Sequence, residues 1–232
     1  SDIEEAANQK ANGLSVIDPR HEAVEGLTDL LMLRQEVEVA TFTQDSANYD
    51  AERVLTLAGS DMLSDPTSDA IAIILQAIEG PLIYRANSLC FGHIVWQSLR
   101  KHPQLVEAAK GVTDKGLITK AQFADLFELK PEQVHIGEGY LNTAKPGQDP
   151  SLERVWGNSI QAHYVDPLKR KVNDKRPTWG AEAVYGTKVS GSIPDPDIGL
   201  NGGERVRVGH RRKPLLIATS VGSQISNAVA AS

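Results

Sequence analysis

The sequence predicts an α+β fold in which helices precede strands. Apolar residues recur at steps of three and four over much of the first 127 residues, which is typical of helices. After residue 134 they alternate with polar residues, which is typical of strands. Helices and strands do not alternate regularly, as they would in a doubly wound sheet. We find no internal repeat or low-complexity tract that would indicate a solenoid or a propeller.

The longest predicted element is a helix over residues 21–42. Its apolar residues lie three or four positions apart: Ala23, Leu27, Leu30, Leu33, Val37 and Ala40. Charged residues occupy much of the remaining surface: Glu22, Glu25, Asp29, Arg34, Glu36 and Glu38. We therefore expect a long amphipathic helix with a single packing face.

Four shorter helices are predicted from their start and stop signals. The first follows Asp65 to Ser68, carries Ile71, Ile74, Leu75 and Ile78, and ends at Gly80 and Pro81. A short buried strand over 88–92 leads into the second, which runs through Val95 and Leu99. The third begins at Pro103 and ends before Gly111, and the fourth begins at a capping box of Thr119 and Gln122.

Strands are predicted in the second half, bounded by Gly, Pro and Asp turns. They cover residues 134–136, 161–165, 182–185, 205–208 and 215–219. Two charged segments, 166–177 and 190–203, are expected to be long surface or interface loops.

The composition of the 232 residues excludes several classes of protein. A formal net charge of −6 argues against tight binding to nucleic acid, because that affinity comes from cations that neutralise phosphates. No apolar run approaches the roughly 20 residues that cross a bilayer, so we expect no membrane span. The single cysteine, Cys90, excludes an internal disulfide and a Cys-rich zinc site, and it fits folding in a reducing, intracellular environment.

The first five residues contain neither the basic start nor the apolar stretch of a secretion signal. They also contain no initiator Met, so we expect that upstream sequence has been removed.

We expect no catalytic, cofactor-binding or metal-binding residues. The histidines are scattered, and we expect none to pair with a histidine, cysteine or carboxylate at a metal-ligand spacing. They are His21, His93, His102, His135, His163 and His210. Cys90 lies in an apolar strand without a neighbouring base, which favours a buried small hydrophobe over a nucleophile. No serine sits in a Gly-x-Ser-x-Gly turn, so triad chemistry is not expected.

Three further motifs are interpreted as structural. The glycine-rich segment 199–209 precedes a strand and lacks a Lys-Ser ending, which favours a turn over a phosphate site. Asp195 and Asp197 are interrupted by prolines, which favours a stiff solvated loop over a cation site. The tryptophans are expected in the core or at subunit contacts: Trp96, Trp156 and Trp179.

The densest basic patch consists of Lys169, Arg170 and Lys171 with Lys175 and Arg176. No aromatic residue is interleaved for base stacking, so a solvated loop is favoured over a nucleic-acid contact.

In order and spacing from about residue 21 to 229, the segments resemble the tailed-phage major capsid proteins. Residues 33–40 resemble the family's long spine helix, and 57–65 resemble the segment after it, although Met62 and Leu63 stand where several relatives carry a tryptophan. Later segments resemble the entry to the family's axial domain and its later strands: 86–92, 99–103, 134–137, 142–144 and 155–157.

The resemblance implies the tailed-phage capsid fold, with a peripheral domain and spine helix at 1–84, an axial domain at 85–200, and C-terminal strands at 201–232 that return to the peripheral domain. The family's N-terminal arm and extended loop are expected to be missing. The implied function is structural and not enzymatic: self-assembly into the icosahedral shell that encloses a phage genome.

The implied partners are other copies in pentamers and hexamers, with scaffold, portal or decoration proteins as further partners. Double-stranded DNA would be enclosed without specific binding. The implied location is the virion, after assembly in the host cytoplasm. We also expect acidic faces of the long helix to meet the basic segment 169–171 of a neighbouring subunit.

Two other interpretations remain open. A cellular nanocompartment of the same fold would enclose an enzyme cargo in place of a genome. A small α/β enzyme or ligand-binding domain would need a polar pocket and a converging set of reactive groups, which the sequence does not show.

Overall fold

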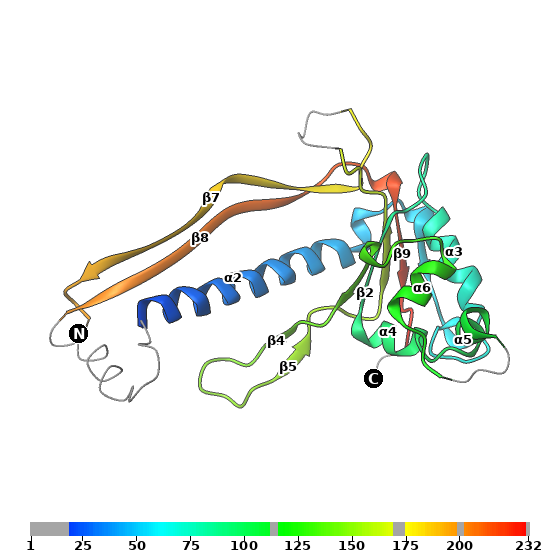
Figure 1. The fold of residues 1–232 in the computed structure, drawn as a ribbon, viewed down its shortest axis with the longest axis horizontal. Coiled ribbons are helices and arrows are strands. Elements are labelled where there is room, and N and C mark those ends of the chain that lie inside the picture. The colour runs from blue at the N-terminus through cyan, green and yellow to red at the C-terminus, as the bar shows by residue number, and fades with distance from the viewer. Residues whose placement is uncertain (1–18, 112–115, 169–174, 199–201, 231–232) are drawn as a thin grey trace. The chain divides into compact units, whose positions relative to one another are not determined.

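The computed structural model describes residues 19–111, 116–168, 175–198 and 202–230 (Figure 1). The chain divides into two compact units. Unit 1 comprises Ser1–Val37 and Glu182–Lys213, and unit 2 comprises Glu38–Ala181 and Pro214–Ser232. Helices and sheets occur together, which confirms the predicted α+β class.

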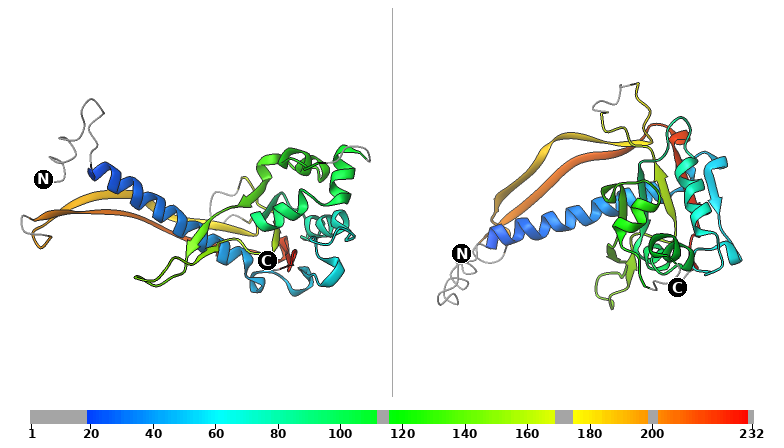
Figure 2. Two further views of the ribbon diagram at one scale, coloured as in Figure 1. Left: turned by 90° about the horizontal axis from the view of Figure 1, so that it is seen from below. Right: turned by 45° about the vertical axis from the view of Figure 1, so that its right-hand side comes forward.

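Unit 1 contains most of one long helix and a two-stranded sheet. The helix, α2, spans Pro19–Gln44 and confirms the helix predicted over residues 21–42. The sheet pairs β7, Gly180–Asp195, with β8, Gly203–Leu216, and Figure 2 shows the two strands running side by side along their length. The predicted strands 182–185 and 205–208 are therefore present but much longer. Residues 190–195 continue β7, so the loop predicted over 190–203 is wrong for that part.

The single packing face predicted for α2 is wrong over its first turns. Leu27 and Leu30 belong to the predicted face and are exposed, as is Met32 on another side of the helix. Only near its end, within unit 2, does the helix bury side chains, at Ala40 and Thr43. The apolar periodicity is real, but within the described residues the first half of this face stays exposed.

Unit 2 is built on a five-stranded sheet in the order β1-β9-β6-β2-β3. The strands are β1 Val54–Thr56, β9 Gly222–Ser226, β6 Ile160–His163, β2 Ser88–Gly92 and β3 Val134–Gly137. β6 is antiparallel to both neighbours, while β1 pairs with β9 and β2 pairs with β3 in parallel. β2, β3 and β6 confirm the predictions at 88–92, 134–136 and 161–165.

Four helices accompany this sheet: α3 Ala70–Glu79, α4 His93–Leu99, α5 Pro103–Lys110 and α6 Lys120–Leu126 (Figure 1). All four confirm the predicted helices. Thr119 and Gln122 form the predicted capping box, and Gly111 ends α5 with a φ of 87°, a conformation that favours glycine. Their apolar faces meet those of β2, β6 and β9 in one core that includes Ile74, Phe91 and Phe123.

Short elements complete unit 2. A small hairpin pairs β4, Tyr140–Asn142, with β5, Leu152–Arg154. Single 3₁₀ turns lie at Ser46–Asn48, Ala51–Arg53, Gly59–Asp61, Pro131–Gln133 and Thr219–Val221.

The strand predicted over residues 215–219 is confirmed at its first two residues and wrong for the rest. Leu215 and Leu216 end β8, and the chain re-enters the sheet only at β9. Gly222, Ser223 and Gln224 make β9 look polar, yet all three are buried. Gln224 Nε2 donates to the carbonyl of Gln44 at 2.7 Å, and Ser223 Oγ donates to that of Ala77, so burial leaves these donors satisfied.

Candidate assembly surfaces

The histidines mostly have structural surroundings. His163 is buried, its ring stacks on Trp179 at 4.0 Å between centroids, and its Nε2 lies 2.7 Å from the hydroxyl of Tyr49. That hydroxyl donates to the carbonyl of Thr43 at 2.6 Å, so a neutral His163 can donate to it in turn. Burial lowers the pKa of His163 to about 3, which keeps the ring neutral, and raises the pKa of Tyr49.

One histidine contradicts the expectation that none pairs with a carboxylate at a metal-ligand spacing, because His21 Nε2 lies 3.3 Å from Glu25 one turn along α2. His93 Nδ1 also lies 3.3 Å from a carboxylate, that of Glu138, which is distant in the sequence. His102 Nε2 lies 3.1 Å from Ser68 Oγ, and burial lowers its pKa. Among the described residues, no group of three or more His, Cys, Asp or Glu side chains is arranged to hold a metal ion.

The other candidate residues also lie in structural settings. Burial raises the pKa of the Cys90 thiol to about 11, which leaves it protonated at neutral pH. Trp96 and Trp179 are buried in the core, and the Trp156 ring lies so close to Gly137 that a Cβ there would stand 2.0 Å from it.

The structure describes two of the three remaining candidate segments, the aspartate and glycine-rich ones, more fully than the basic patch. Asp195 accepts hydrogen bonds from Arg205 and from the backbone of Asp197. In the glycine-rich segment a strand follows from Gly203, as predicted. Residues 169–171 of the basic patch lie outside the described residues. The other two residues of the patch are described: Lys175 is exposed, and Arg176 Nη1 lies 3.5 Å from Asp166.

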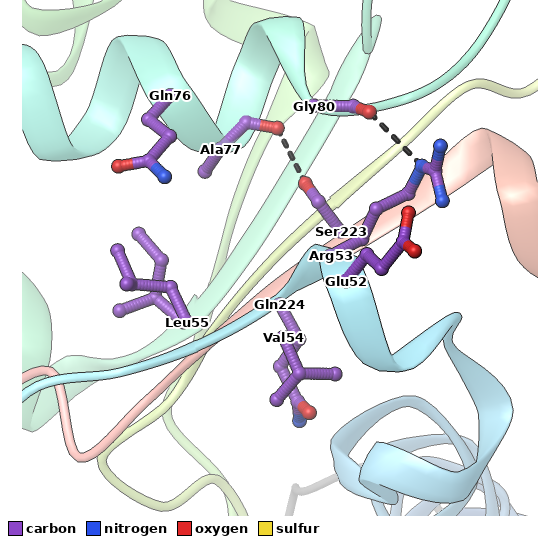
Figure 3. Close-up of a pocket in the computed structure, with 10 residues that line it drawn as sticks. Glu52, Arg53, Val54, Leu55, Gln76, Ala77, Gly80, Ser223 and Gln224 are labelled. Atoms are coloured by element: carbon purple, nitrogen blue, oxygen red, sulfur yellow. Dashed lines mark hydrogen bonds between the residues drawn. The ribbon is translucent and has the colours of Figure 1, made fainter.

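A hollow of about 210 Å³ lies beside β1 and the end of α3 (Figure 3). Its polar groups are occupied by structural bonds: Arg53 Nε donates to the carbonyl of Gly80 at 3.1 Å, and Ser223 Oγ donates to that of Ala77. Glu52 is exposed at its edge. The hollow therefore holds no converging nucleophile and base. In the part of the chain that the structure describes, no helix is long and apolar enough to cross a membrane.

Exposed apolar side chains are the more prominent feature of the surface. In unit 1 they lie on α2, on β7 and in the turn after β7: Leu27, Leu30, Met32, Val184, Tyr185, Val189, Ile193 and Ile198. In unit 2 most of them form two groups, one at Leu82, Ile83, Tyr84, Val165 and Leu168, the other on the β4–β5 hairpin at Tyr140, Leu141 and Leu152; Leu117, shortly before α6, is exposed as well. Large exposed apolar residues in several groups are typical of surfaces that other proteins cover.

β8 adds a charged face to unit 1. Along this strand Val206, Val208, His210 and Arg212 are half-buried, while the alternate residues Arg205, Arg207, Gly209, Arg211 and Lys213 are exposed. Because side chains alternate between the two faces of a strand, four cations lie on one face. Arg205 pairs with Asp195. α2 carries exposed acidic side chains, among them Glu22, Glu25 and Asp29.

Comparison with known proteins shows the family to which the chain belongs. No family model matches the sequence. The chain is 39% identical to the major capsid protein of Pseudomonas phage JBD67 over 215 residues, which cover 92% of this chain and 68% of that protein. This chain belongs to the phage major capsid protein family. It is therefore a structural protein of the virion that self-assembles into a capsid, as its resemblance to the family predicted.

Two further similarities are consistent with this family, one in sequence and one in fold. The major capsid protein of Burkholderia phage BcepMu is 26% identical over 228 residues, which cover 97% of this chain and 72% of that protein. The crystal structure of a phage-related protein from Bordetella bronchiseptica superposes with a TM-score of 0.72 and 23% identity, covering 89% of this chain and 67% of that one. The latter likeness shows a shared fold. For a capsid protein, the exposed apolar and charged groups are surfaces on which neighbouring subunits can pack.

Proposed function

We propose that this capsid protein builds an icosahedral shell from pentamers and hexamers around a double-stranded DNA genome. The observation that carries the proposal is the 39% identity to a phage major capsid protein over 92% of the chain. The excess of acidic residues supports enclosure of the DNA without specific binding, because few phosphates would be neutralised. Assembly takes place in the host cytoplasm.

Within the shell, we propose that α2 is the spine helix of a peripheral domain covering residues 1–84. Residues 85–200 form an axial domain, and 201–232 return to the peripheral domain. The exposed apolar groups support this role, since every subunit of a closed shell must present complementary faces to its neighbours. Scaffold, portal and decoration proteins are the further partners of these faces.

The test is the mass of native particles of the full-length protein, purified from infected cells and from cells that express this protein alone. We expect closed shells by light scattering and negative-stain microscopy, with nuclease-protected double-stranded DNA in the particles from infection. Particles that contain an enzyme cargo and no DNA would indicate a cellular compartment. A protein that stays monomeric in both preparations would overturn the assembly role.

A further inference from the structure

The loop between α3 and β2 presents three consecutive apolar side chains to solvent. Leu82 is 50% exposed, Ile83 is 79% exposed and Tyr84 is 45% exposed. The residues on either side differ, because Pro81 and Ala86 are both buried. The exposed apolar tip is thus part of a loop whose two ends are anchored in unit 2.

Ile83 has a backbone conformation that a β-branched residue rarely adopts. Its φ is 72°, and the backbone N–H of Tyr84 donates to the carbonyl of Leu82 at 2.8 Å, which closes a γ-turn with Ile83 at its centre. Turns of this kind are rare and strained, and isoleucine suits them worse than glycine or asparagine. A strained residue that points its apolar side chain into solvent is not explained by the stability of the subunit. Such strain is concentrated at functional positions.

Hydrogen bonds hold this loop in place on all sides. Leu82 N–H donates to the carbonyl of Ser220 at 2.9 Å, and Ala86 N–H donates to that of Ile78 at 2.9 Å. Arg85 donates to the carbonyl of Phe127 at 2.8 Å and pairs with Glu128 at 2.9 Å. The tip is therefore ordered before any partner arrives, which lowers the entropic cost of binding.

A second segment extends the apolar surface. The rings of Tyr84 and Tyr164 stack at 4.5 Å between centroids, and the side chain of Asn87 bonds both backbone groups of Val165. Val165 and Leu168 are exposed beyond this stack. We call the five residues Leu82, Ile83, Tyr84, Val165 and Leu168 the apolar knob. These five large side chains are between 42% and 79% exposed and together present roughly several hundred Å² of apolar surface, a size at which patches mark protein interfaces.

We propose that the apolar knob is buried against a second copy of this chain in the assembled shell. This inference rests on the proposed function, since a capsid protein is surrounded mainly by copies of itself. Among the described residues, two ion pairs within the subunit lie beside the knob, Arg85 with Glu128 and Arg176 with Asp166. These two pairs add no unpaired charge of their own to a contact between two copies.

The receiving surface on the second copy is a hollow of about 430 Å³. Leu63, Pro66, Ile94 and Val229 line it, with Lys101 at its polar side. The knob lies beside Ser220, before β9 begins, whereas Val229 follows the end of β9. Knob and hollow thus lie towards opposite ends of that strand. A contact between two different surfaces of one subunit is head-to-tail, and such contacts form a ring, such as a pentamer or hexamer, when the rotation from copy to copy closes.

The first test replaces Ile83 by glycine in the full-length protein and compares it with Leu117→Gly, a matched change at another exposed apolar residue of unit 2. Glycine tolerates the φ of residue 83, so the melting temperature of the free Ile83→Gly subunit should stay the same or rise. Loss of a buried anchor should lower the yield of particles at least about tenfold, while Leu117→Gly assembles normally. Normal assembly of Ile83→Gly would overturn the inference, while failure of the unmodified protein to assemble would overturn the proposed function.

The second test needs no loss of assembly. Ile83→Cys subunits, half of them labelled with ¹⁵N, are assembled and treated with a short thiol-to-amine crosslinker, and linked peptides are identified by mass spectrometry. We expect links of mixed isotope between position 83 and Lys101 of another copy. A link to a different segment of a second copy would overturn the assignment of the hollow. Links within one chain only, or to another virion protein only, would overturn the interface between copies.

Discussion

The two units differ in how they bury apolar side chains. In unit 2, aromatic and aliphatic residues from four helices and five strands form a continuous core, with Phe91, Phe123 and Ile74 fully enclosed. In unit 1, no described residue is buried, although β7 and α2 carry large apolar side chains such as Tyr185 and Leu30. Unit 2 has the interior of an independently stable domain, whereas unit 1 has the exposed surfaces of a structure completed by its neighbours.

Removal of a large side chain from the core of unit 2 should have the largest effect on the stability of the subunit. Phe123 is fully buried and contacts the rings of Phe91, Trp96 and Phe127. Phe123→Ala should lower the free energy of unfolding of the subunit by about 3–5 kcal/mol, because it removes apolar contacts and leaves a cavity. Urea denaturation of the unassembled protein measures this. A loss below about 1 kcal/mol would mean that unit 2 lacks a tightly packed core.

The pH dependence of stability should also come largely from unit 2. Burial holds the pKa of His163 at about 3, whereas the unfolded chain has the ordinary value near 6.5. Between these values the unfolded state binds a proton that the folded state does not. Stability is therefore unaffected by this group above about pH 6.5 and falls by about 1.4 kcal/mol per pH unit as the pH drops towards 4.

His163→Gln tests this contribution, because the amide can bond Tyr49 but does not titrate. Denaturation of both proteins between pH 7 and 4 should show a shallower slope for the variant, by about one proton. Equal slopes would mean that His163 titrates normally and is accessible to water. The comparison uses slopes, so it holds even where the substitution lowers stability at every pH.

The same division explains which features could be predicted from the sequence. The helices of unit 2 were predictable because their signals are local, such as the capping box at Thr119 and the stop at Gly111. β9 could not be predicted in this way, because Gly222, Ser223 and Gln224 fit the core only through contacts with residues that are far away in the sequence. A Cβ on Gly222 would stand 2.3 Å from the ring of Trp179, a contact between residues far apart in the chain.

In unit 1, prediction from the sequence failed for a different reason. Periodicity showed that α2 has apolar positions such as Leu27 and Leu30, but it did not show that they stay exposed among the described residues. The apolar knob was missed for a similar reason: Leu82 and Ile83 follow a helix stop and look like an ordinary loop. A run of apolar residues directly after Gly80 and Pro81 was the available signal.

Substitutions on the surface of unit 1 should affect assembly while leaving the stability of the free subunit nearly unchanged. Leu30 is 64% exposed on α2 and Tyr185 is 75% exposed on β7. Changing either to serine should alter the unfolding free energy of the free subunit by less than about 0.5 kcal/mol. Sedimentation of assembly reactions should nevertheless show fewer particles, since apolar contact area between subunits is lost. Unchanged assembly by both variants would show that these residues stay exposed in the shell.

The cationic face of β8 should make the smallest contribution to assembly, and this contribution should depend on the salt concentration. Arg207 and Arg211 are exposed, and no ion pair within the described residues involves either of them. We expect this face to meet acidic side chains of a neighbouring α2, so Arg207→Glu and Arg211→Glu should slow assembly at low ionic strength. The difference should largely disappear near 1 M salt, where screening acts within about 3 Å. Lys130→Glu, an equal charge reversal at an exposed residue outside β8 and outside the basic patch, is the control. Slower assembly that persists unchanged in 1 M salt would show that the two arginines act by packing and not by charge.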